Sequence, residues 1–165
     1  MQIPKRKLGN RPPTKADPYL TQEKINELEI KLKRMRNKQP QLAAEVKILA
    51  SDGDFSENAG YQLAKGHLRG LNQRILDTEN QLKSAIVIVP QNNNSLVQVG
   101  NTIDVELRGK RKTFTILGSA ETNPLQGVIS RNSPIGSAIL NKKVGDIAKI
   151  KLGDKEAEYR IIKIH

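Results

Sequence analysis

Two stretches of the chain decide the fold: residues 25–49, INELEIKLKRMRNKQPQLAAEVKIL, and residues 61–85, YQLAKGHLRGLNQRILDTENQLKSA. Steps of three and four residues along the first stretch select Ile25, Leu28, Leu32, Met35, Gln39, Leu42, Val46 and Leu49. The same steps along the second select Tyr61, Ala64, Leu68, Leu71, Ile75, Thr78, Leu82 and Ala85. Positions with this spacing share one side of a helix, and most of them are apolar here. The pattern predicts two amphipathic helices, each roughly 30 residues and 45 Å long.

The break between the two helices indicates how they pair. It is short and contains Asp52-Gly53, and it separates two apolar faces of equal length. We therefore expect the chain to fold back into an antiparallel hairpin and to remain a monomer, because the hairpin covers its own apolar surface. Parallel pairing of two chains is the alternative. Pro40 lies inside the first helix and removes one backbone hydrogen bond, so a kink or a local loosening is expected there.

The last part of the chain changes to the alternating pattern of β-strands. Strands are predicted at residues 99–107, 113–117, 126–131, 147–152 and 157–164. Ser133-Pro134 supplies an N-cap and a first-turn proline for a short helix over residues 135–141. The fold class is therefore α+β: an antiparallel helical hairpin followed by a small α+β domain with a mostly antiparallel sheet.

Composition suggests where these parts begin and end. Residues 1–19 are rich in Lys, Arg and Pro and predict a basic disordered arm. Residues 20–89 form the hairpin with an acidic tip, residues 90–96 (Pro-Gln-Asn-Asn-Asn-Ser-Leu) a linker, and residues 97–165 the C-terminal domain.

The overall composition excludes several classes of site. The formal net charge is +11, and the chain has no Cys, two His, three Tyr, two Phe and no Trp. Disulfide frameworks, thiolate chemistry, Cys- or His-rich metal sites and base-stacking platforms are therefore not expected. No apolar run reaches the ~18–20 residues of a membrane span, and the N-terminus resembles no signal peptide. We expect a cytoplasmic protein with no membrane contact, whose positive charge favours nucleic acid or an acidic partner.

The end of the predicted hairpin carries the opposite charge. No basic residue occurs between Lys47 and Lys65, yet Asp52, Asp54 and Glu57 fall there. These acids could cap the second helix and complement its dipole. Alternatively, Asp54 and Glu57 could be ligands of Mg²⁺, which binds through one or two carboxylates when a partner supplies the remaining ligands. A calcium loop of the EF-hand type is excluded, because its sixth and twelfth positions would be Glu57 and Leu63.

Two motifs resemble a known family. Residues 54–61, DFSENAGY, followed by Ala64-Lys65, are similar to the coiled-coil tip of the Gre transcript-cleavage factors of bacterial RNA polymerase. Residues 129–136, ISRNSPIG, with Val144-Gly145-Asp146, are similar to the C-terminal domain of that family. The resemblance runs in the same order from about Leu20 to the C-terminus.

The resemblance implies a fold and a function. The C-terminal domain would be FKBP-like and would dock on the rim of the polymerase secondary channel, while the hairpin enters the channel. Asp54 and Glu57 would help the polymerase hold a shared Mg²⁺ and position the water that cleaves the 3′ end of backtracked RNA. A two-metal site stabilises both the attacking and the leaving oxygen. The chain would then stimulate the polymerase and would be no enzyme itself.

Further residues follow from the resemblance. Asn132, Ser133 and Pro134 match the polymerase-docking element, with a plain helix cap as the alternative or parallel role. Phe55 at the tip is expected to pack against polymerase. Lys47, Lys65 and Arg69 lie within about three turns of the tip and would meet the nascent RNA, or simply be solvated. Gly60 stands where many relatives carry an acid, which raises the question of reduced activity. The basic arm, residues 1–19, is expected to make weak contact with nucleic acid or polymerase.

Three rival functions differ from this interpretation. A Gre paralogue could occupy the channel and inhibit polymerase without promoting cleavage, but the Asp54 and Glu57 pair favours cleavage. Peptidyl-prolyl isomerase activity needs an aromatic-lined pocket, and residues 97–165 contain only Phe114 and Tyr159 as aromatics. A basic coiled-coil protein that binds DNA would explain the charge but neither the acidic tip nor the second domain.

Overall fold

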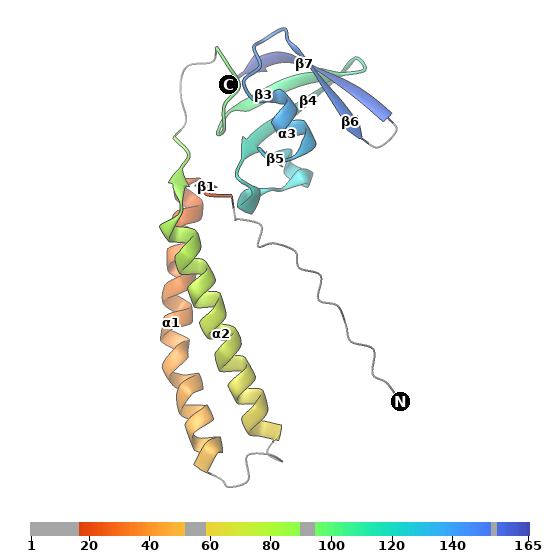
Figure 1. Ribbon diagram of the computed structural model, residues 1–165. Coiled ribbons are helices and arrows are strands. Elements are labelled where there is room, and N and C mark those ends of the chain that lie inside the picture. The colour runs from red at the N-terminus through yellow and green to blue at the C-terminus, as the bar shows by residue number, and fades with distance from the viewer. Residues whose placement is uncertain (1–16, 52–58, 90–94, 153–154) are drawn as a thin grey trace, which may run out of the picture.

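The computed structural model describes residues 17–51, 59–89, 95–152 and 155–165. A long helical hairpin extends away from a small curled sheet (Figure 1). The hairpin consists of α1 (Gln22–Ser51) and α2 (Ala59–Lys83). The predicted arm up to residue 16, the acidic segment 52–58 and most of the predicted linker lie outside the described residues.

The apolar faces predicted from the sequence form the contact between the two helices. Every position selected by the spacing is buried or half-buried, and Met35, Leu71 and Ile75 form the centre of the contact with Leu32 and Leu42 packed against them. The one polar residue in the α1 set, Gln39, donates from Nε2 to Asn72 Oδ1 at 2.9 Å. The hairpin is thus confirmed, and α1 remains helical through Pro40.

The C-terminal part forms a five-stranded sheet in the order β5-β4-β3-β7-β6. The strands are β3 (Thr102–Leu107), β4 (Lys110–Leu117), β5 (Val128–Ser130), β6 (Ile147–Leu152) and β7 (Lys155–Ile164). All neighbours are antiparallel except β4 and β5, which are parallel. The chain passes from β4 to β5 through two 3₁₀ turns, η1 (Ser119–Glu121) and η2 (Pro124–Gln126). The mostly antiparallel sheet agrees with the sequence prediction.

One helix covers this sheet and closes the core. Helix α3 (Pro134–Ile139) places Ile139 in a cluster with the inward side chains of the strands. Ile103, Val105, Ile116 and Ile161 in that cluster are completely buried. Side chains alternate between the two faces of a strand, so β3 buries Ile103 and Val105 and leaves Thr102, Asp104 and Glu106 half-buried.

A two-stranded parallel pair at the base of the hairpin was not predicted. Strand β1 (Tyr19–Leu20) lies beside β2 (Ile86–Val87). Ile86 N donates to Pro18 O at 2.7 Å, and Ile88 N donates to Leu20 O at 2.8 Å. Residues 17–19 were predicted to belong to the basic arm, because two-residue strands are too short to show a pattern. Tyr19 instead pairs with Ile86 in this sheet, and Leu20 is completely buried.

Candidate functional site

The hairpin brings the flanks of the acidic segment to one place. Ser51 ends α1 and Ala59 begins α2, at the end of the hairpin remote from the sheet (Figure 1). The predicted tip residues Asp54, Phe55 and Glu57 belong to the segment between them and lie outside the described residues. Within the described ranges, no group of three or more His, Cys, Asp or Glu side chains could hold a metal ion. Any metal at the tip would therefore need ligands from the undescribed segment or from a partner.

The predicted RNA-contacting cations lie on both helices. Lys65 and Arg69 share one side of α2, where they border an open hollow with Leu68. Lys65 Nζ lies 5.4 Å from the ring centroid of Tyr61, and that ring is half-buried in the contact between the helices. Lys47 is exposed on α1.

Ser133 acts as a helix cap. Its Oγ accepts a hydrogen bond from Gly136 N at 3.0 Å and donates one to Ser130 O at 2.7 Å. Pro134 follows at the first helical position, where its missing N–H costs nothing. The hydroxyl of Ser133 is thus engaged inside the domain, whereas Asn132 and Pro134 are exposed.

Asn132 takes part in a contact between the two halves of the molecule. Its Nδ2 donates to Asp17 Oδ2 at 3.0 Å and to Ser119 Oγ at 3.3 Å. The same Asp17 oxygen accepts from Ser119 N at 3.0 Å. A partner that docks on the Asn132 amide would have to replace these contacts.

This contact extends along the start of the hairpin, and we call it the clasp. Thr21 N donates to Glu121 Oε2 at 3.0 Å, and the Thr21 hydroxyl donates to the other oxygen of Glu121. The Arg131 guanidinium lies 4.1 Å from the centroid of the Tyr19 ring, which is a cation–π geometry. The clasp consists of Asp17, Tyr19 and Thr21 on one side and Ser119, Glu121, Arg131 and Asn132 on the other.

The clasp holds the first turn of α1. Thr21 Oγ1 also accepts from Lys24 N at 3.2 Å, so the residue that caps α1 is itself bonded to Glu121 of the other domain. Asn132 was singled out from the sequence for a different role, and Thr21 stands where a capping residue precedes a periodic stretch. The contacts of the clasp themselves were missed, because the partners lie about 100 positions apart.

The shifted pKa values lie away from the clasp. The hydrogen bond from Thr113 and then that from His165 lower the pKa of Asp104 on β3 below its usual value. The hydrogen bond and charge of Glu158 raise the pKa of Lys149, and those of Lys24 lower the pKa of Glu27. All three groups are exposed ion pairs or hydrogen-bonded pairs, a pattern typical of structural pairs on a surface.

None of the described helices is both long enough and apolar enough to cross a bilayer.

Two known families match most of the chain. Residues 18–87 match the family described as "Transcription elongation factor, N-terminal", and residues 91–165 match "Transcription elongation factor, GreA/GreB, C-term". The chain belongs to the GreA/GreB family of transcription elongation factors.

Two GreA sequences agree with this assignment to the GreA/GreB family. Transcription elongation factor GreA of Macrococcus caseolyticus is 36% identical over 149 residues, which cover 88% of this chain and 94% of the relative. GreA of Staphylococcus saprophyticus is 37% identical over 136 residues, which cover 81% and 86%. A crystal structure of GreA factor homolog 1 from Thermus thermophilus is 25% identical, with a TM-score of 0.40 over 88% of this chain and 97% of that one.

The two matched segments of the Gre sequence meet near the end of β2. The N-terminal match ends at residue 87, the last residue of β2, and the C-terminal match begins at residue 91. The clasp therefore joins the start of the N-terminal Gre segment to the C-terminal one, through Tyr19 and Thr21 inside the match and Asp17 directly before it. Residue 18, where the N-terminal match begins, lies inside the clasp segment.

Proposed function

We propose that this Gre-family factor binds RNA polymerase through its secondary channel and stimulates Mg²⁺-dependent cleavage of the 3′ end of backtracked RNA, which rescues arrested complexes. It does so in the cytoplasm, as a monomer, with polymerase and the nascent RNA as its partners. The factor has no hydrolytic activity of its own and lends two carboxylates to the polymerase site.

One observation carries this proposal. The described ends of α1 and α2, Ser51 and Ala59, are the flanks of a segment whose sequence contains Asp54 and Glu57. A packed hairpin about 45 Å long can carry such a segment far from the docking domain into a narrow channel. The contact around Met35, Leu71 and Ile75 supports this use, because it stiffens the hairpin midway along its length.

The donor set suits Mg²⁺. Carboxylate oxygens are hard ligands, and Mg²⁺ keeps waters and phosphate oxygens around one or two of them. Asp54 and Glu57 would hold the ion jointly with polymerase, and the ion would supply Lewis acidity and a polarised water. The factor contributes the position of the two carboxylates. Two ligands alone bind Mg²⁺ weakly, so no resident metal is expected in the free protein.

The positive charge elsewhere serves the approach to RNA. Lys65 and Arg69 on α2, with Lys47 on α1, lie within a few turns of the acidic segment and would face phosphates of the transcript. Asn132 and Pro134 would contact the polymerase rim, while Ser133 keeps them in place by capping α3. Phe55 at the tip would pack against polymerase inside the channel.

The test is RNA cleavage in a purified backtracked elongation complex with Mg²⁺. We expect the wild type to shorten the transcript from its 3′ end and Asp54→Ala/Glu57→Ala to lose about a hundredfold or more in rate, the scale of removing electrostatic contacts to a transition state. The matched control, Glu45→Ala/Asp77→Ala, removes two exposed acids from the helices and should cleave like the wild type.

A second function remains as the alternative: occupation of the channel that inhibits polymerase without cleavage. If the wild type binds polymerase, slows elongation and leaves the transcript intact, the inhibitor function replaces the one proposed here. If the double variant cleaves as fast as the control, Asp54 and Glu57 are helix-capping residues only.

A further inference from the structure

The turn between β3 and β4 concentrates positive charge. Arg108, Lys110, Arg111 and Lys112 fall within five residues, and no acid occurs from Leu107 to Ala120. All four side chains are exposed. The ion pairs among the described residues lie elsewhere, at Lys24–Glu27, Arg36–Glu79, Lys149–Glu158 and His165–Asp104. The charge of the turn is therefore available to a partner.

The turn is tight and carries a cation at its apex. Leu107 pairs with Lys110, which leaves only Arg108 and Gly109 between the strands. Both have left-handed backbone conformations, with φ of 51° and 75°. Asn, Asp or Gly is favoured at the first of these positions, and arginine there is strained. Strain at an exposed apex suggests that the guanidinium has a use outside the fold.

Strand alternation distributes the other cations over both faces of the ribbon. Arg111 pairs with Glu106 on the outer face, while Lys110 and Lys112 pair with Leu107 and Val105 on the opposite face. On the neighbouring strand β7, Arg160 also pairs with Glu106. Glu106, the acid nearest to the turn, therefore lies between Arg111 on one neighbouring strand and Arg160 on the other.

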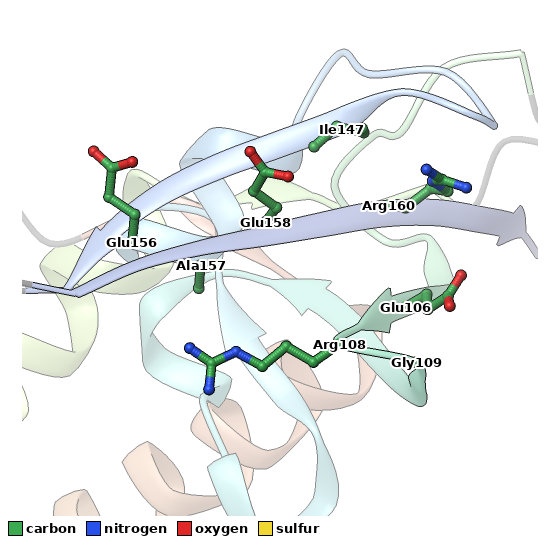
Figure 2. Close-up of a pocket in the computed structure, with 8 residues that line it drawn as sticks. All are labelled: Glu106, Arg108, Gly109, Ile147, Glu156, Ala157, Glu158 and Arg160. Carbon is green, nitrogen blue, oxygen red and sulfur yellow. The ribbon is translucent and has the colours of Figure 1, made fainter.

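Other acids lie farther along the sheet. Arg108 borders an open hollow of about 370 Å³, which Glu106, Glu156, Glu158 and Arg160 also line. In Figure 2 the Arg108 side chain lies on one side of β7 and the carboxylates of Glu156 and Glu158 point to the other side. Glu158 Oε1 lies 3.1 Å from Lys149 Nζ, which offsets its charge. The end of the ribbon remains positive.

Protection of a sheet edge explains only part of this pattern. β4 pairs with β5 only at Thr115–Leu117, so its first half is an edge, and charged residues on an edge discourage pairing with other chains. That role accounts for Lys110 and Lys112. It does not account for a strained arginine in the turn itself, which no strand could extend.

We propose that the basic turn, formed by Arg108, Lys110, Arg111 and Lys112, binds the phosphate backbones of B-form DNA. The major groove of B-DNA admits a two-stranded ribbon, and cations on both faces then meet phosphates on both walls of the groove. A flat acidic protein surface would meet only one face. The major groove of duplex RNA is too deep and narrow, and single strands favour aromatic platforms, which the turn lacks. Phosphate contacts of this kind do not discriminate between DNA sequences.

The inference is tested with the full chain and a fluorescent DNA duplex of mixed sequence, with affinity followed by anisotropy over a salt series. Each phosphate contact contributes about −0.9 to the slope of log K against log[salt]. Lys110→Gln/Arg111→Gln/Lys112→Gln should therefore make the slope shallower by about 2–3 and weaken binding at least tenfold at low salt. The control Lys142→Gln/Lys143→Gln/Lys163→Gln lowers the net charge of +11 by the same three and should lose less than half as much.

A second variant keeps the test valid if the triple variant misfolds. Arg108→Gly relieves the left-handed strain, so it should fold at least as well as the wild type and still make the slope shallower by about 1. Equal slopes for the wild type and both turn variants would overturn the proposal, as would equal losses in the turn and control triples. An equal loss of affinity for poly-glutamate and for the duplex would replace it with a general anion-binding surface.

Discussion

Two glycines differ sharply in what surrounds them. Gly118 has an ordinary extended backbone, yet a Cβ there would overlap the carbonyl oxygen of Tyr19 in the clasp. Gly66 lies inside α2, and a Cβ there would have nothing within 4 Å. The close approach of the two domains thus excludes a side chain at Gly118. At Gly66 a side chain would fit, and glycine there only lowers the stability of α2.

We predict opposite effects of the same methyl group at these positions. Gly118→Ala should lower the free energy of unfolding by about 1–3 kcal/mol, because β1 must shift to make room. Gly66→Ala should raise it by ~0.5–1 kcal/mol, the difference in helix propensity. Urea unfolding followed by circular dichroism measures both. A neutral Gly118→Ala would mean that β1 does not pack against Gly118 in solution.

Strand β3 carries a side chain, Asp104, that makes hydrogen bonds to residues outside the strand. Asp104 accepts a hydrogen bond from Thr113 Oγ1 on β4 at 2.7 Å and lies 3.1 Å from His165 Nε2 beyond the end of β7. These hydrogen bonds, that of Thr113 first, lower the pKa of Asp104, and Lys163 contributes a smaller charge effect. The ionised carboxylate therefore links β3 to β4 and to His165, which follows β7.

A pH dependence of stability follows from this lowered pKa. A carboxyl group with a lower pKa in the folded than in the unfolded state stabilises the fold above its unfolded pKa, near ~4, and loses that contribution as the pH falls through the folded value. Asp104→Asn should therefore lower Tm at neutral pH, with the difference from the wild type closing in acid. Glu106→Gln removes the same charge from β3. If both variants show the same closing difference, net charge and not the Asp104 contacts is responsible.

At the scale of the whole molecule, the clasp sets how the hairpin meets the sheet. Asp17 accepts hydrogen bonds from Ser119 N, Ser119 Oγ and Asn132 Nδ2, all within 3.1 Å. Thr21 and Glu121 add a second attachment at the cap of α1. Because α1 starts directly after Thr21, the direction of the long hairpin depends on a few contacts at its base (Figure 1). Function in a channel would require that direction to be controlled.

We expect Asp17→Ala to widen the range of orientations that the hairpin adopts relative to the sheet. Loss of hydrogen bonds to a charged group should cost about 2 kcal/mol at this contact. The chain has no native Cys, so labels on Lys38→Cys and Lys143→Cys report one distance between hairpin and sheet. Pulsed electron paramagnetic resonance should show a narrow distribution for the intact clasp and a broader one with Asp17→Ala, while the surface variant Asp77→Ala changes nothing. An unchanged distribution with Asp17→Ala would show that other contacts fix the orientation.

Much of the fold could be predicted from local patterns. The helical faces around Met35 and Leu71, the strand around Val105 and the cap at Ser133 all depend on residues a few positions apart, whose spacing records which side is buried. The strand boundaries were less accurate, because pairing through the two-residue turn starts β4 at Lys110 and not at Thr113. Asp54, Glu57 and the arm up to residue 16 were singled out by sequence alone and remain predictions.

The hairpin, the alternating strands and the family all follow from the amino-acid sequence, because each is encoded in residues close together or in an ordered set of motifs. The strand order with its parallel β4–β5 pair and the small β1–β2 sheet became visible only in the folded molecule. The tertiary structure also decided that Asn132 is held by Asp17. These features join residues that are far apart in the chain, and such contacts are fixed by the geometry of the packed domains and leave no periodic pattern in the sequence.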